Sequence, residues 1–480
     1  MKKIYLSFAA HCHLSDLEKY SDEKFYEKAL TKIIQFLYTH PKISFSFYIP
    51  ASYIDWLSEA HNEFLIVLKD LTNRKQLEIL GGGYYEPIFP LITPLDRIGQ
   101  IEATSTVIRK KIGKRIHGVF LGDSIWDTNL ISSFKSCGID YAIVHNKLIN
   151  ESERSGKVFI VEDIGKTLNI IPYYDFSEEA YKDENILEPQ EFLEKITKSL
   201  FYAENSQENS EQEKFIYFTS INFWDLIKLI DSNWLETFFE LAIKSPIFDF
   251  SCPASYINSE NNFIRTFISG TCPPKIKKWA VIPFVSMNED EKLKNANIRN
   301  FVYNCQEVQY LYSRVMYSET IASQCKGDKN RKSSVREFIW KAQRQDLYWF
   351  LGDAGICNPK NRFEAYKNLI CAEKIVRETS PTVANSFISF DYDMDGRKEY
   401  IVHRNDYNAF ISQCGGLIFE LDLMSNAKNY CDTMRRIPFY DGVMDVYPKK
   451  LFLLVNLIYI LQQYFLLHHF LSFDFFENIT

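Results

Sequence analysis

Residues that could carry out chemistry occur at several short sites, of which His11-Cys12-His13 is the first. If this segment is extended, the two imidazoles lie on one face. They could clamp a substrate or provide half of a metal site, or they could be two hydrogen-bonded structural histidines. Because the spacing suggests no third His or Cys ligand, the sequence predicts no metal.

The second site is the glycine-rich run Gly81-Gly82-Gly83-Tyr84-Tyr85-Glu86-Pro87. Glycine permits positive φ angles and a close approach to the backbone, and the tyrosines with Glu86 would suit a sugar or another polyol. A tight strand-to-helix turn is the alternative. The run lacks the GxGxxG and GxxxxGK(S/T) spacings of nucleotide sites, and the sequence predicts no cofactor.

The third site is Gly122-Asp123-Ser124-Ile125-Trp126, which follows an apolar run. An acid beside an aromatic residue is a candidate nucleophile or general acid, although Asp before a helix also serves as an N-cap. Further along, Tyr348-Trp349 and the loop 352–355 could form another aromatic wall or could pack in the core.

The elements that must position these sites alternate between short β-type runs and helix-length amphipathic segments through the first half of the chain. This alternation predicts a parallel sheet, open or closed as a barrel, with the site in the loops at the carboxyl ends of the strands. The predicted strands are 4–9, 43–49, 77–80, 118–121, 140–144, 168–172, 215–219 and 247–251, and the predicted helices between them are 23–38, 96–111, 129–136, 189–203 and 234–243.

The second half of the chain changes character twice. Residues 296–318, 333–350 and 363–377 have helical periodicity. Residues 385–390, 399–402, 407–412 and 417–422 then return to short strands separated by glycine turns.

Composition excludes several classes of protein. With 55 Lys and Arg against 62 Asp and Glu the net charge is −7, so the chain has no basic footprint for nucleic acid. The 46% apolar residues are typical of a folded protein. Ten cysteines without a CxxC pair, and no signal peptide in residues 1–10, predict a cytoplasmic protein with reduced thiols. The apolar stretch 451–471 is interrupted by Asn456, Gln462, Gln463, His468 and His469, which disfavours a membrane span.

Five stretches in order resemble glycoside hydrolase family 57, specifically its 4-α-glucanotransferase and α-amylase branch. The first three are His11-Cys12-His13, residues 78–87 with Glu78, Tyr85 and Glu86, and residues 118–126 continuing into 137–141. The fourth includes Ala342-Gln343, Asp346, Tyr348-Trp349, Gly355, Pro359 and Arg362, and the fifth comprises residues 391–399, 415–422 and Arg435-Arg436.

The resemblance implies an α/β fold in which an incomplete (β/α)₇ barrel is followed by a helical domain and a partial β-sandwich. It places the barrel at 1–285, a helical domain that completes the active-site cleft at 286–380 and the start of the sandwich at 385–445. Residues 446–480 form an atypical apolar tail, for which we expect a truncation or frameshift origin.

The sequence departs from the family pattern at its catalytic positions. The family uses a Glu nucleophile where Asp123 stands, and an Asp acid/base in a region that here reads Phe218-Thr219-Ser220-Ile221-Asn222-Phe223. The nearest carboxylate is Asp225, on the helix that should follow. Phe120 and Phe350 replace a Trp and a His, and Leu14-Ser15 replace Gln-Pro. A retaining glycosidase needs two carboxyl groups about 5–5.5 Å apart, so weak or lost turnover is expected.

Two hypotheses follow. The first is a protein that acts on α-1,4-glucan or maltooligosaccharide through a degraded retaining site. The resemblance then makes Asp123 the nominal nucleophile, and the substrate-binding residues are His11, His13, Glu78, Tyr85, Glu86, Trp126 and Trp349. The second hypothesis is a catalytically inactive α-glucan-binding protein or a truncated pseudogene product. A deacetylase-like metal hydrolase on a related barrel is disfavoured by the missing third ligand, and a homo-oligomer is compatible with the sequence.

Overall fold

A computed structural model describes residues 2–121, 125–149, 156–182, 185–201, 213–259, 263–270, 280, 296–349 and 355–432. Asp123, Phe350, the loop 352–354 and the apolar stretch 451–471 therefore lie outside the described residues. None of the helices in the described ranges combines the length and apolar character that a bilayer crossing requires.

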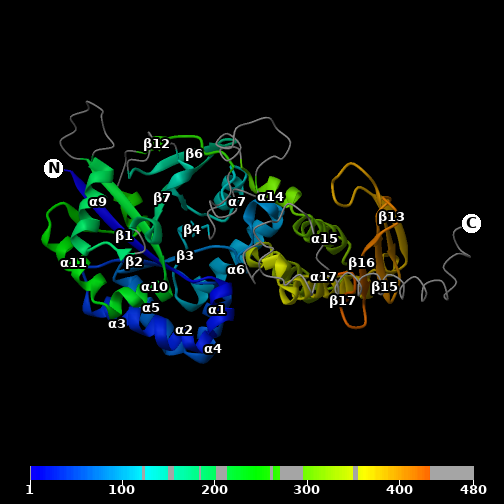
Figure 1. Ribbon diagram of the computed structural model, residues 1–480. Coiled ribbons are helices and arrows are strands. Elements are labelled where there is room, and N and C mark those ends of the chain that lie inside the picture. Colours follow the sequence, from blue (N-terminus) through cyan, green and yellow to red (C-terminus); the bar gives the residue numbers. More distant parts are fainter. Residues whose placement is uncertain are drawn as a thin grey trace, which may run out of the picture.

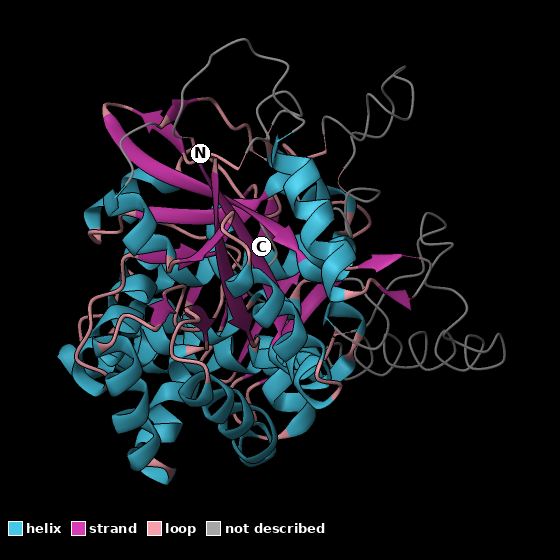
Figure 2. Cartoon of the chain, turned by 90° about the vertical axis from the view of Figure 1, so that its left-hand side faces the viewer, coloured by secondary structure: helices cyan, strands magenta, loops and turns pink. Residues whose placement is uncertain are grey.

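The amino-terminal part is a nearly closed barrel of parallel strands surrounded by helices (Figures 1 and 2). Going around the ring, the strands are β1 (Lys3–His11), β2 (Phe45–Tyr48), β3 (Leu77–Leu80), β4 (Gly118–Phe120), β5 (Tyr141–His145), β7 (Lys166–Asp175) and β10 (Lys214–Asn222), and β10 pairs with β1 again. Between β3 and β4 the ring is joined by a parallel bridge from Gly81 to Val119. This arrangement confirms the predicted incomplete (β/α)₇ barrel.

Alternation along the strands explains why the barrel forms. In β1, Ile4, Leu6, Phe8 and Ala10 pack against the surrounding helices, while Ala9 faces the barrel interior. Interior positions of other strands also carry bulky side chains, among them Tyr48, Leu80, Phe120, Ile143 and Ile171. Because both faces are covered, the strands read as nearly continuous apolar runs in the sequence.

Helices cover the outside of the barrel. They are α1 (Leu14–Tyr20), α2 (Asp22–Phe25), α3 (Thr31–Thr39), α4 (Ala51–Ala60), α5 (Asn62–Asn73), α6 (Pro94–Lys111), α7 (Leu130–Ser136), α8 (Phe176–Glu179), α9 (Pro189–Phe201), α10 (Phe223–Asp231), α11 (Trp234–Lys244) and α12 (Pro253–Ser259). Three further strands extend the sheet outside the ring: β6 (Phe159–Asp163) lies antiparallel to β7, β12 (Ile264–Arg265) pairs with β6, and β11 (Phe248–Phe250) pairs with β1.

The second part consists of helices followed by one antiparallel sheet, at the right of Figure 1. The helices are α14 (Ile298–Asn304), α15 (Gln306–Ala322), α16 (Lys329–Ala342), α17 (Pro359–Thr379) and α18 (Pro381–Ala384). The strands, in spatial order, are β13 (Ser386–Phe390), β14 (Glu399–His403), β15 (Tyr407–Ile411), β16 (Ile418–Leu423) and β17 (Lys428–Asn429). Helices and sheet share one hydrophobic core, to which the helices contribute Leu311 and Leu369 and the sheet Ile401 and Phe410.

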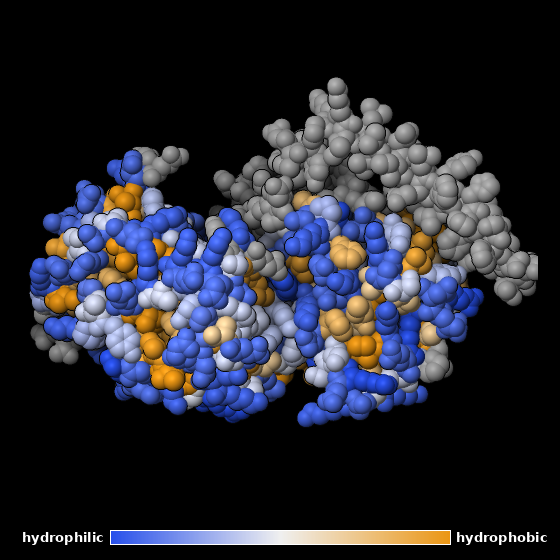
Figure 3. All heavy atoms as spheres, turned by 90° about the horizontal axis from the view of Figure 1, so that it is seen from below, coloured by the Kyte–Doolittle hydropathy of each residue, from blue (hydrophilic) through white to orange (hydrophobic). Residues whose placement is uncertain are grey.

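The surface seen from below in Figure 3 is largely hydrophilic, with hydrophobic residues in small separate patches. The helices after residue 296 pack on the sheet as one unit. The predicted division of the chain at 285 and 380 stays a prediction.

Candidate active site

The carboxyl ends of three neighbouring barrel strands lie level with one another. His11, the last residue of β1, is in register with Tyr48 at the end of β2 and with Asn222 at the end of β10. The turn after β3 carries Glu86, whose carboxylate reaches the same place. The first and second predicted sites therefore come together at the mouth of the barrel, where ligands of parallel barrels bind.

His11 is fixed by a hydroxyl and an aromatic ring. Its Nδ1 lies 2.8 Å from the Ser220 hydroxyl of β10. Its ring stacks on Phe120 with centroids 5.6 Å apart and an interplanar angle of 22°. The imidazole is thereby held in one orientation at the barrel mouth.

Glu86 is the centre of a second polar group. One carboxylate oxygen, Oε1, accepts a hydrogen bond from the Tyr48 hydroxyl at 2.9 Å and lies 2.9 Å from Nδ1 of His13. The other, Oε2, accepts from the Leu14 N–H at 2.7 Å. The Glu86 side chain is 4% exposed and the His13 side chain 20% exposed, so the carboxylate orients an imidazole that reaches solvent.

An aromatic wall continues from these groups across the barrel mouth. Phe120 lies 5.1 Å from Tyr48 and 5.7 Å from Tyr173, measured between ring centroids. Tyr173 in turn lies 5.1 Å from His145, the last residue of β5. Sequence reasoning did not assign Tyr48, Tyr173, His145 or Ser220 to the site, although the position of each near the end of a predicted strand was a signal that could have found them.

A small cavity opens beside Glu86, between the ends of β2, β3 and β4. Its lining residues are Tyr48, Gly83, Glu86, Pro87, Ile88, Phe89, Phe120, Leu121, Ile125 and Gln345. Leu121 and Ile125 flank Asp123 in the sequence, and both line this cavity.

Glu78 lies away from the strand ends. It precedes Leu80 by two residues, which places it about 7 Å further down the barrel interior at roughly 3.3 Å per residue. Its Oε1 accepts from the Tyr141 hydroxyl at 2.6 Å, and its Oε2 from the Ala254 N–H at 3.0 Å. Burial raises the pKa of this carboxyl. Both oxygens serve the fold, and this placement favours a structural role over contact with sugar.

Two of the three predicted aromatic contacts are buried, and the third contacts the helical segment. Trp126 is fully buried, and its indole N–H donates to the Ile268 carbonyl at 3.1 Å. Trp349 is buried against Phe301, with centroids 5.9 Å apart. The Tyr85 hydroxyl donates to Glu337 of α16 at 3.2 Å. In these positions the first two residues pack the interior, and Tyr85 joins the barrel to the helical segment.

Two carboxylates near the end of β10, Asp16 and Asp225, are the candidates for the acid/base that the family pattern lacks in this chain. Asp225 lies on α10, is 53% exposed and pairs with Lys228 at 2.7 Å. Asp16 lies closer to the polar groups of the mouth, because its Oδ2 accepts from the His13 N–H and from the Asn222 amide, both at 3.0 Å. Asn222 also caps α10 by accepting from the Trp224 N–H. These contacts give both Asp16 and Asn222 roles in holding the local backbone.

One group of acidic side chains in the described part of the chain has the proximity that a cation would need. Oxygens of Asp391, Asp393 and Asp395 lie within 4.8 Å of one another in the loop between β13 and β14. Exposed acidic residues often cluster in this way without a metal, and this loop belongs to the sheet rather than to the barrel mouth. We assign it no metal.

Comparison with known proteins identifies similar sequences over most of the chain. The family model of glycosyl hydrolase family 57 matches residues 2–180. The model of the alpha-amylase/4-alpha-glucanotransferase C-terminal domain matches residues 391–440.

Two curated relatives are similar along most of this chain. Alpha-amylase 1 of Dictyoglomus thermophilum is 24% identical over 470 residues, covering 91% of this chain and 65% of that protein. The 4-alpha-glucanotransferase of Thermococcus kodakarensis is 25% identical over 444 residues, covering 86% of this chain and 64% of that protein. The chain thus spans slightly less than two thirds of the length of these relatives.

Among solved structures, the 4-alpha-glucanotransferase from Thermococcus litoralis superposes with a TM-score of 0.75 at 21% identity. The superposition covers 94% of this chain and 71% of that one. At this identity the likeness establishes the fold, and it agrees with the barrel, helices and sheet described above.

Proposed function

Because residues 2–180 belong to glycosyl hydrolase family 57, we propose that this protein acts on α-1,4-glucans or maltooligosaccharides. Relatives similar along most of the chain are named alpha-amylase and 4-alpha-glucanotransferase, which supports this substrate class. The observation that carries the proposal is the convergence of His11, His13 and Glu86 at the carboxyl ends of β1 and β3.

The geometry suits sugar hydroxyls. Imidazoles and a carboxylate offer donors and acceptors at fixed positions, and hydrogen bonds between Ser220 and His11 and from Tyr48 to Glu86 hold them there. The Phe120 ring lines the small cavity beside these groups and gives it an apolar wall. A site arranged in this way distinguishes a polyol from an apolar ligand.

For bond cleavage, the proposal makes Asp123 the nucleophile. A retaining mechanism also needs a carboxylic acid that protonates the leaving oxygen. The end of β10, where the family acid would stand, presents Ser220 and Asn222, and these side chains contact His11 and Asp16. Neither group can act as a carboxylic acid. We therefore propose a degraded retaining site with weak turnover, and glucan binding without turnover as the second candidate function.

Incubation with maltoheptaose tests the proposal. Chromatography of the products of wild type and Asp123→Ala distinguishes the reactions, with Glu240→Gln, an exposed residue on α11, as the matched control. Longer and shorter glucans that disappear in Asp123→Ala would establish a transferase, and shorter sugars alone a hydrolase. Absence of products together with saturable maltoheptaose binding would favour the binding protein. Absence of both from folded protein would overturn the proposal.

A further inference from the structure

The turn that carries Glu86 is held by the helical segment. Glu86 has a φ of 49°, a left-handed conformation that non-glycine residues rarely adopt and that its surroundings must hold in place. Its carbonyl accepts a hydrogen bond from the Gln345 N–H at 2.9 Å. Pro87 forms an antiparallel bridge with Arg344. The chain immediately after α16 therefore fixes the backbone on which the Glu86 carboxylate is mounted.

Two glutamines connect the same turn to the interior. The Tyr85 N–H donates to Oε1 of Gln100 at 3.0 Å, and Nε2 of Gln100 donates to Oε1 of Gln343 at 2.9 Å. Nε2 of Gln343 then donates to Oδ2 of Asp96 at 2.7 Å. Gln100, Gln343 and Asp96 are at most 1% exposed. The two links of Gln343, to Gln100 and to Asp96, are fully buried, so breaking either would leave a buried polar atom unsatisfied.

We call the chain of hydrogen bonds from the Tyr85 N–H through Gln100 and Gln343 to Asp96 the relay. Its two ends fix the direction in which its members donate. A backbone N–H, here that of Tyr85, can only donate. Asp96 accepts at both oxygens, because its Oδ1 accepts from the Trp340 indole N–H at 2.9 Å. Each amide between these ends consequently has one orientation that satisfies all of its contacts.

We infer that Gln100 and Gln343 are positioning residues, which hold the Tyr85-Glu86 turn so that the Glu86 carboxylate meets His13. The helical segment then completes the glucan site rather than only flanking it. This inference rests on the proposed function for its link to sugar, but the placement of the turn can be measured without sugar.

Reversing the relay provides the test. Gln100→Glu still accepts from Tyr85 but turns a second oxygen toward Gln343, so the relay breaks. Adding Asp96→Asn repairs the relay by reversing it. The new amide N–H at position 96 donates to Oε1 of Gln343, whose side-chain amide has flipped. Nε2 of Gln343 then donates to the new carboxylate at position 100. We expect each single substitution to weaken maltoheptaose binding by about 10- to 100-fold. The double variant Asp96→Asn/Gln100→Glu should recover most of this loss, but not all of it, because Asp96→Asn also removes the carboxylate that lies 3.5 Å from Arg336, and the flipped Gln343 no longer donates to Glu319.

Hydrogen–deuterium exchange of the peptide containing residues 84–86 gives a readout without sugar. Exchange should be about 10-fold faster in Gln100→Glu and return most of the way to the wild-type rate in the double variant. Single variants that bind maltoheptaose like wild type, or a double variant no better than the singles, would overturn the inference. If wild type fails to bind maltoheptaose, the proposed function is wrong, and the exchange rates alone decide the positioning inference.

A second pair of variants covers the case in which the single substitutions at 96 and 100 do not fold. Gln345→Pro removes the N–H that donates to the Glu86 carbonyl, at the first residue of a short helical turn where proline is tolerated. Gln345→Ala truncates the same side chain and keeps the N–H. Faster exchange of residues 84–86 in Gln345→Pro than in Gln345→Ala supports the part of the inference by which the helical segment holds this turn, and equal rates contradict it.

Discussion

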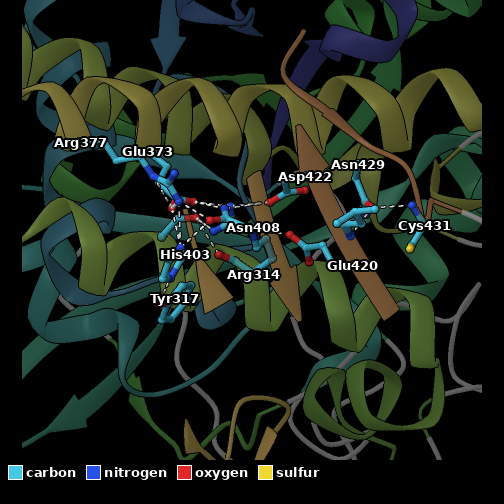
Figure 4. A network of polar contacts seen from close by, with 12 residues as sticks. Arg314, Tyr317, Glu373, Arg377, His403, Asn408, Glu420, Asp422, Asn429 and Cys431 are labelled. Carbon is cyan, nitrogen blue, oxygen red and sulfur yellow. Dashed lines mark hydrogen bonds and ion pairs between the residues drawn. The ribbon is translucent and has the colours of Figure 1, made fainter. Parts of the chain in front are cut away.

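Replacing Arg314 by methionine should destabilise the joint between the carboxyl-terminal helices and sheet. Figure 4 shows that its guanidinium, from α15, points into a group of acidic side chains. It lies 2.7 Å from Glu373 of α17, 2.7 Å from Glu420 and 3.1 Å from Asp422 of β16, and all four side chains are at most 1% exposed. Removing one partner of such a buried ion pair costs about 3–5 kcal/mol.

The charges of this cluster explain the size of the loss. Arg314 and Arg377 face three carboxyl groups. Burial, and then the neighbouring Asp422, raises the pKa of Glu420, while Arg314 opposes that rise. Without Arg314, Glu420 and Asp422 lose the guanidinium that pairs with both of them in the interior.

The loss should depend on pH. Burial alone would raise the pKa of Glu373, but Arg314, His403 and Arg377 together lower it. A carboxyl whose folded pKa is depressed stabilises the fold above its unfolded pKa of about 4.3, and this contribution is lost as pH falls through the folded value. Arg314 is the largest of the causes that lower this pKa, so in Arg314→Met the pKa of Glu373 rises, and protonation as pH falls relieves the variant. The difference from wild type is therefore widest at neutral pH.

Hydrogen–deuterium exchange at pH 7 measures the effect locally. In Arg314→Met, exchange in α17 and β14–β16 should accelerate by about 10²- to 10⁴-fold, the equivalent of 3–5 kcal/mol at 1.4 kcal/mol per tenfold. Strands β1 and β10 belong to a separate core and should be unaffected. Arg74→Met, which breaks an exposed pair with Asp70, is the control and should cost below about 1 kcal/mol. An Arg314 variant no less protected than this control would refute the reasoning.

Three further predictions concern single side chains. Burial raises the pKa of Glu78, so its protonated form stabilises the fold below about pH 4.3, and this contribution fades as pH rises. Glu78→Gln should therefore flatten the dependence of Tm on pH above that value. An unchanged dependence of Tm on pH would contradict this. Trp126→Phe removes the hydrogen bond to the Ile268 carbonyl and should lower the free energy of unfolding, measured with denaturant, by about 1–3 kcal/mol. If stability is unchanged but maltoheptaose binds more weakly, Trp126 contacts sugar instead. Asp225→Asn should leave maltoheptaose products unchanged by chromatography because Asp225 is exposed beside Lys228, and loss of products would identify it as the acid.

The barrel was predictable because its signals are local. Apolar runs bounded by helix-length segments indicate parallel strands, and residues that follow such runs share one edge of the barrel. His11, His13 and Glu86 come together for this reason. How deep a residue lies inside the barrel was not predictable from these signals. Glu78 belongs to the same motif as Glu86 but lies inside the barrel, where Tyr141 takes one of its oxygens.

Contacts between distant segments were beyond the sequence pattern. Gln100 and Gln343 are separated by 243 positions, and nothing near either residue indicates the other. The direction in which Trp126 turns after β4 depends on the Ile268 carbonyl, which lies 142 positions away. Such pairings follow from tertiary packing rather than from local periodicity.

Equilibrium binding of maltoheptaose tests the central claim most directly, because it separates the glucan site from turnover. Isothermal titration should show saturable binding to wild type and to the control Glu240→Gln. Glu86→Gln removes the charge beside His13 at nearly constant size and should weaken the affinity by about tenfold or more. Equal affinities for all three proteins would place the sugar elsewhere. Folded wild type that binds no maltoheptaose would contradict the account.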